Sequence, residues 1–88
     1  MSRAKKLKKY RMDAGLTIYT LGERLEVDPS SISYWESGKK TPRMNRIIQL
    51  EDMFGVGHRE LFSDLSEEET RELEERALSM HNHKKRRD

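Results

Sequence analysis

The chain has 88 residues, of which 39% are charged, 33% apolar and 7% aromatic. This length leaves room for one small domain and a short appendage, with a core too shallow for an enclosed active site. The absence of cysteine excludes disulfides, thiolate chemistry and cysteine zinc sites, and suits a reducing cytoplasm. No run approaches the roughly 18–20 apolar residues of a membrane span, and no apolar stretch of a secretory signal follows the charged start. We therefore expect a small, helical, cytoplasmic protein.

Charge is segregated along the chain, although the formal net charge is only +2. Residues 1–46 contain 11 Lys or Arg and 5 Asp or Glu, which gives +6. Residues 47–83 contain 3 basic and 10 acidic residues, which gives −7, and residues 84–88 add +3. A basic amino-terminal half favours a polyanionic partner, which would repel the acidic segment behind it. The segregation therefore indicates nucleic acid binding by the first half of the chain.

The apolar spacing predicts an all-α chain in which short helices are separated by caps and glycines. A first helix over residues 2–14 would stop at Gly15, because glycine readily adopts the left-handed conformation that closes a helix. A second helix would begin after Thr17, a good N-cap residue, and end near Glu26. Only two residues then separate this helix from the next, so the two helices must cross steeply.

The third helix has the best-marked start in the sequence. Asp28 is an N-cap residue whose carboxylate can accept hydrogen bonds from the free amides of the first turn. Pro29 then occupies the first helical position, where its missing N–H costs nothing, and Gly38 ends the helix. Ile32 and Trp35 share one face, and small polar side chains share the other.

Three further helices are expected behind a basic loop at residues 39–43. The fourth would stop at the glycines of residues 55–57, a brief fifth would cover residues 58–62, and a sixth would cover about residues 67–80. Helical spacing assigns six side chains to the core, namely Leu21, Leu25, Val27, Trp35, Ile47 and Ile48.

Two helices joined by a tight turn, the second displaying small polar side chains, form a helix-turn-helix. From about Leu7 to Phe62 the sequence also carries Tyr10-Arg11, Ala14-Gly15-Leu16-Thr17, Ile32-Ser33-x-Trp35-Glu36-x-Gly38 and Gly55-Val56. On these residues the chain resembles the Cro/phage-repressor type of helix-turn-helix regulators, the xenobiotic-response-element class. The resemblance implies a compact five-helix DNA-binding domain over residues 1–63. An acidic helix and a basic tail would follow over residues 64–88.

The resemblance further implies a sequence-specific transcriptional regulator, most commonly a repressor, that binds a near-palindromic operator in duplex DNA as a homodimer. In the family the third helix enters the major groove, which assigns base reading to its outward side chains, Pro29, Ser30, Ser33 and Tyr34. Serine hydroxyls discriminate weakly between bases, and this helix has no Arg, Gln or Asn for bidentate readout. Part of the specificity should therefore come from DNA shape or from nearby basic residues.

Phosphate contacts are implied at the start of the second helix and beyond the third, at Thr17, Ile18, Tyr19, Lys39, Lys40, Arg43 and Asn45. An ion pair between Arg11 and Glu36 is also implied, and it would fix the first helix against the third. The sequence departs from the family at three positions of the motif. One is Ile18, which stands where many members have glutamine, so one common contact with the DNA backbone is expected to be absent. Glu26 stands where glycine is usual, at a turn position that suits a left-handed backbone, and Gly22 replaces the usual alanine, which predicts a closer helix crossing.

No motif indicates an enzyme, a metal site or a cofactor. The serines of residues 30–33 have no His and Asp partners with which to form a nucleophile. The six glutamates of residues 67–75 are more typical of a solvated helix face than of catalytic carboxylates. His81 and His83 could hold a metal, but no third ligand is near and the chain has no cysteine.

The carboxy-terminal segment leaves two functions open. A capping box of Ser66 and Glu69 would start its helix, whose apolar stripe consists of Leu73, Ala77 and Met80. The stripe could support the homodimer, as could the fourth and fifth helices. Alternatively, the chain is an antitoxin or regulatory module that binds a protein partner through residues 66–88. The basic residues 84–87 form either a disordered tail or an additional DNA-contacting arm, in a bacterial or phage-encoded protein.

Overall fold

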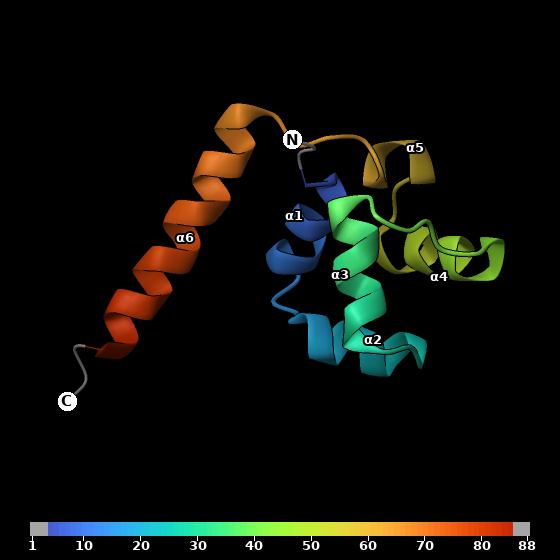
Figure 1. Ribbon diagram of the computed structural model, residues 1–88, viewed down its shortest axis with the longest axis horizontal. Helices are drawn as coiled ribbons and strands as arrows, with labels where there is room; N and C mark the ends of the chain where they lie inside the picture. The colour runs from blue at the N-terminus through green and yellow to red at the C-terminus, as the bar shows by residue number, and fades with distance from the viewer. Residues whose placement is uncertain (1–3, 86–88) are drawn as a thin grey trace.

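The computed structural model describes residues 4–85, with side chains described as far as residue 78 (Figure 1). Within this range the regular elements are helices, and the one bridge of β type is an isolated antiparallel bridge between Lys5 and Asp64. The all-α prediction is therefore confirmed. The helices are α1 (Lys6–Asp13), α2 (Ile18–Leu25), α3 (Pro29–Ser37), α4 (Met44–Phe54), α5 (His58–Leu61) and α6 (Glu67–Lys85).

The start of α1 differs from the predicted helix over residues 2–14, of which residues 1–3 lie outside the described chain. Lys5 is extended, with φ −85° and ψ 156°. Its amide donates to the carbonyl of Glu36 at 2.7 Å, and the carbonyl of Ala4 accepts from the amide of Leu65 at 2.9 Å. These long-range bonds hold the chain before Lys6 extended, so the helix begins later than local spacing indicates.

The start and the end of α2 confirm the predictions for this helix. The Thr17 hydroxyl accepts from the amide of Thr20 at 3.0 Å, and the Thr20 hydroxyl accepts from the amide of Thr17 at 2.8 Å. Glu26 then closes the helix in the left-handed conformation, with φ 59° and ψ 46°. A side chain with a β-carbon therefore occupies a conformation that is ordinarily left to glycine.

Asp28 is the N-cap residue of α3, but the predicted bond from its side chain is wrong. The amide of Ser31 donates instead to the Asp28 backbone carbonyl, at 2.9 Å, and the carboxylate makes no capping bond. The carboxylate is exposed to solvent. At the other end of α3, Gly38 has φ 83°, as expected for a closing glycine.

One core holds α1 to α5 together, and its buried members are Leu7, Leu21, Leu25, Ile32, Trp35, Leu50 and Leu61. Val27 packs against this core and Ile47 is partly buried. The assignment of Ile48 to the core is wrong, because this side chain is 49% exposed. Leu50 is the fully buried residue of α4, and positions two apart on a helix face different directions.

The last helix, α6, leaves the bundle next to the amino terminus and runs past α1, with its carboxy-terminal half away from the other helices (Figure 1). The predicted capping box is present, since the Ser66 amide donates to Glu69 and the Glu69 amide donates to Ser66. The helix continues to Lys85, beyond the predicted end at residue 80. Among the described residues, no helix combines the length and apolar character that crossing a membrane requires.

Candidate nucleic-acid interface

Helix α3 runs through the middle of the bundle, with α1 on one side and α4 on the other (Figure 1). Ile32 and Trp35 anchor it in the core, while Ser30, Ser33 and Tyr34 are exposed on its opposite side. Ser33 and Tyr34 follow Ser30 by three and four positions, so each lies on the same helix face as Ser30. The structure therefore brings together the residues predicted to read bases, with Pro29 half-buried at the start of the helix.

A buried ion pair fixes α3 against α1. The Nε of Arg11 donates to Oε2 of Glu36 at 2.6 Å, and its Nη2 donates to Oε1 at 3.1 Å. Both residues are buried, which is uncommon for charged side chains unless they are paired. The pair is the one implied by the sequence, and it sets the orientation in which α3 presents its exposed face.

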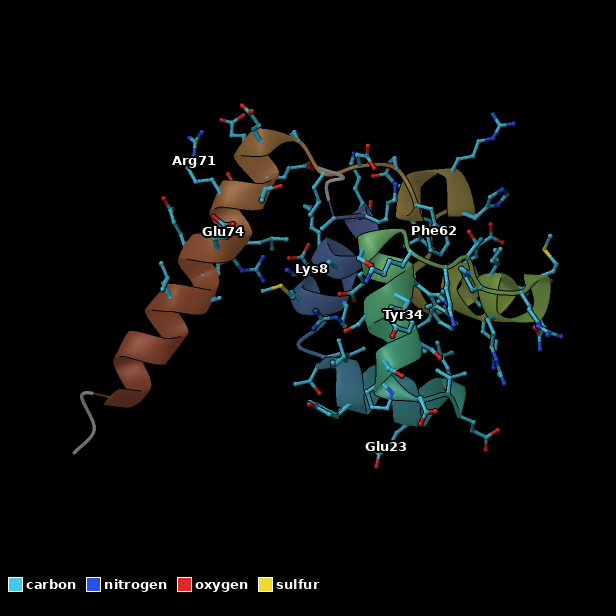
Figure 2. All side chains as sticks on the ribbon, viewed as in Figure 1. Lys8, Glu23, Tyr34, Phe62, Arg71 and Glu74 are labelled. Carbon is cyan, nitrogen blue, oxygen red and sulfur yellow. The ribbon has the colours of Figure 1, made fainter. Side chains whose placement is uncertain are left out.

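The basic loop folds back onto α3 next to Tyr34, whose position on the helix is marked in Figure 2. The amide of Lys40 donates to the Tyr34 carbonyl at 3.3 Å. The ammonium groups of Lys39 and Lys40 lie 5.9 and 5.1 Å from the centre of the Tyr34 ring. Such cation–π contacts are each worth about 0.5–1 kcal/mol at an exposed site. They place two positive charges beside the tyrosine of the exposed face.

The residues predicted to contact phosphate at the start of α2 have different surroundings. Tyr19 is 66% exposed. The Thr17 hydroxyl is already bonded within the capping box, and the Ile18 side chain packs against the core. The Thr17 amide is also bonded, to the Thr20 hydroxyl. A contact at this helix start would therefore use the backbone amide of Ile18, because the first amides of a helix have no partner within the helix.

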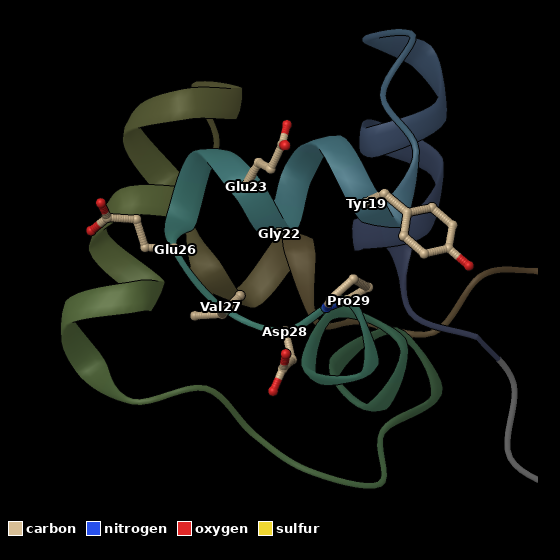
Figure 3. A pocket seen from close by; sticks show the side chains of 7 residues that line it. All are labelled: Tyr19, Gly22, Glu23, Glu26, Val27, Asp28 and Pro29. Carbon is tan, nitrogen blue, oxygen red and sulfur yellow. The ribbon is translucent and has the colours of Figure 1, made fainter.

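A groove between α2 and the start of α3 is lined by acidic side chains (Figure 3). Glu23, Glu26 and Asp28 surround it together with Tyr19, and their carboxylates spread outward from the turn without converging. This negative surface disfavours a phosphate at the turn itself. Within the described part of the chain, no cluster of His, Cys, Asp or Glu side chains could hold a metal ion. The side chains of His81 and His83 lie outside that part.

The basic loop and the first turn of α4 form a second cleft with the opposite character. It is lined by Val27, Trp35, Lys40, Thr41, Pro42, Arg43, Asn45 and Arg46. Three of the residues predicted to contact phosphate, Lys40, Arg43 and Asn45, are thus brought together. Arg46 was not among the residues predicted to contact phosphate, although it follows Asn45 directly and carries a positive charge in the first turn of α4.

The apolar stripe of α6 is divided by the fold. Leu73 is 5% exposed, because it packs in the crevice between α6 and α1 that Lys8 and Glu74 also line (Figure 2). Ala77 and Leu78 are exposed. Leu73 is therefore used within the chain, and the side chain of Met80, the third member of the stripe, is outside the described residues.

Residues 7–61 match the model of a helix-turn-helix protein family. This match covers more than half of the chain and coincides with α1 to α5. The chain therefore belongs to the Cro/phage-repressor type of helix-turn-helix proteins, a family of DNA-binding transcription regulators. Neither the comparison with curated proteins nor that with solved structures gave a match.

Proposed function

We propose that the chain is a sequence-specific transcriptional repressor that binds a near-palindromic operator as a homodimer. The observation that carries this proposal is the exposed face of α3, which the Arg11–Glu36 pair holds in place and which the basic loop flanks. A helix with this arrangement fits the major groove, with the cations of the basic loop beside it near the phosphates. The proposed site of action is the cytoplasm of a bacterium or of a phage-infected host.

Residue roles follow from position in this arrangement. Base reading is proposed for the exposed side of α3, at Pro29, Ser30, Ser33 and Tyr34. Phosphate binding is proposed for the flanking residues Thr17, Ile18, Tyr19, Lys39, Lys40, Arg43 and Asn45. Few of the base-reading groups can form bidentate contacts, so phosphate contacts and DNA shape carry much of the affinity and part of the specificity.

Selection from a random duplex library at near-physiological salt tests the proposal. A palindromic consensus with half-sites about one helical turn apart is the expected result. Ser33→Ala should relax the preference at one position of each half-site, whereas Lys40→Ala should weaken all sequences equally and lower the salt slope by about 1. A pool with no enriched sequence would contradict sequence-specific binding. Repression itself is tested by transcription in vitro from a promoter that contains the selected site.

A second candidate function is binding of a protein partner through α6. The observation that favours it is Leu78, which is 61% exposed on a helix that extends beyond the bundle. Leu78→Ser leaves the buried contact of Leu73 intact, so it tests this face without undocking the helix. Loss of the homodimer and of operator binding would assign the face to self-association. An unchanged dimer with unchanged DNA binding would assign it to another protein or to none.

A further inference from the structure

The basic cleft lies beside the recognition face, between α3, the loop that follows it and the first turn of α4. Its charged lining residues are all basic, namely Lys40, Arg43 and Arg46. By contrast, the groove at the helix-turn-helix turn has three carboxylates and no basic lining residue. The two hollows lie on either side of Val27, which lines both. The basic cleft therefore attracts an anion, and the acidic groove at the turn repels one.

Trp35 contributes an unused hydrogen-bond donor to this cleft. The side chain belongs to the core and is only 7% exposed. A buried tryptophan ordinarily pairs its indole N–H, but no partner for this N–H occurs among residues 4–78. No unpartnered side-chain nitrogen in that range is fully enclosed, so the indole N–H reaches the surface. Since Trp35 lines the cleft, we take its N–H to open there.

The first turn of α4 adds further donors. Arg43 is its N-cap residue and makes no capping bond with its side chain. The amides that follow it carry the partial positive charge of the helix amino terminus. Arg46 donates through Nη1 to the exposed Gln49 at 3.0 Å, which leaves its other guanidinium N–H groups for a ligand. An indole N–H, a guanidinium and helix amides together form a donor set suited to phosphate oxygens.

We propose that this cleft binds one phosphate group of the DNA backbone, with the indole N–H of Trp35 and the guanidinium of Arg46 as ligands. The inference rests on the proposed function and adds Trp35 and Arg46 to the residues proposed to bind phosphate. Trp35 follows Tyr34 directly on α3, and its ring is locked in the core. A phosphate held by Trp35 therefore fixes the depth and register of the recognition face in the groove.

Fluorescence of the intact chain tests the inference directly, because Trp35 is its only tryptophan. The protein is titrated with operator duplex and, separately, with inorganic phosphate at constant ionic strength. We expect saturable changes in Trp35 emission with duplex. A saturable response to inorganic phosphate as well would show that the cleft also accepts the free anion. A response to duplex alone would restrict it to backbone phosphates.

Variants assign the ligands. In anisotropy measurements with labelled duplex, Arg46→Gln should lower the salt slope by about 1 and weaken all sequences alike. Trp35→Phe keeps an aromatic ring in the core and removes the N–H, so it should weaken duplex binding about tenfold, the effect of one hydrogen bond to a charged group. Arg71→Gln on α6 removes the same charge away from the cleft and serves as the matched control. Thermal unfolding establishes that each variant is folded.

The outcomes separate this inference from the proposed function. Sequence-selective duplex binding with silent Trp35 emission, or with an unchanged salt slope in Arg46→Gln, would overturn the phosphate site and leave the regulator intact. Equal loss of the slope in Arg46→Gln and Arg71→Gln would also overturn it, since only overall charge would then matter. A duplex that does not bind at all would contradict both.

Discussion

A β-carbon on Gly22 would lie 2.8 Å from the carbonyl oxygen of Val27. The same two residues are joined by a hydrogen bond, in which the Val27 amide donates to the Gly22 carbonyl at 2.9 Å. The chain leaving α2 thus turns back directly onto the bare face of Gly22 before it enters α3. This contact explains the glycine where the family usually has alanine, and it sets how closely the two helices of the motif cross.

Replacing Gly22 with alanine should therefore lower the free energy of unfolding by about 1–3 kcal/mol, the usual range for an added carbon without space. The loss is expected even though alanine favours a helix interior by about 1 kcal/mol. Urea unfolding measures it. Gly57→Ala is the control, because its β-carbon would meet nothing within 4 Å and its φ is −77°. Equal stability of Gly22→Ala and the parent chain would show that the turn can move aside.

Glu26→Gly should stabilise the chain by about 1 kcal/mol, because it removes a β-carbon from the left-handed conformation. Glu23→Gly is the matched control, since it makes the same change inside α2 and should destabilise by about 1 kcal/mol. Opposite signs in urea unfolding would support the assignment of strain to Glu26. Destabilisation by both variants would contradict it.

Breaking the Arg11–Glu36 pair should cost about 3–5 kcal/mol, because one charge is left buried without its partner. Arg11 additionally donates through Nη1 to the Leu16 carbonyl at 2.9 Å, so its loss also loosens the entry to α2. The double variant Arg11→Met with Glu36→Leu should lose less than the two single variants together. A double-mutant cycle by chemical unfolding measures the coupling, and strict additivity would show that the pair contributes nothing as a unit.

Acid should weaken the junction between α4 and α5. Hydrogen bonds from the His58 ring and backbone amide lower the pKa of Glu51 below its ordinary 4.5. A lowered pKa means that the stabilisation is present above pH 4.5 and is lost as the pH falls through the lower pKa of the folded chain. The melting temperature of Glu51→Gln should therefore lie below that of the parent at pH 6 and converge with it in acid. A difference that persists at pH 3 would contradict this origin.

The docking of α6 should depend on Leu73. An ion pair between Arg76 and Asp13, at 2.9 Å, adds to this contact but is exposed and contributes at most about 1 kcal/mol. Leu73→Ala should cost about 2 kcal/mol of local stability and increase amide exchange in α6. Leu78→Ala is the control, since its side chain is exposed and its loss leaves no cavity. Unchanged exchange in Leu73→Ala would show that α6 folds without this contact.

Local chemistry predicted most helix ends correctly, because caps and closing residues act over three or four positions. Thr17, Glu26, Gly38 and the pair of Ser66 and Glu69 lie where the sequence indicated. Predictions of which side chains are buried were less accurate, because burial depends on how the helices pack. Ile48 is apolar and was predicted to lie in the core, but its side chain is about half exposed on α4.

The all-α class and the helix-turn-helix were determined by the sequence itself, through residue spacing, caps and motif. So was the expectation that Arg11 would pair with Glu36, which came through family resemblance. Only the tertiary structure decided which hydrogen-bond donors and basic side chains line the same cleft. Trp35 reads as a plain core residue along the chain, and Arg46 as one cation among many. They line one cleft because the loop after α3 brings the start of α4 beside α3, and such a juxtaposition depends on long-range packing that no local pattern encodes.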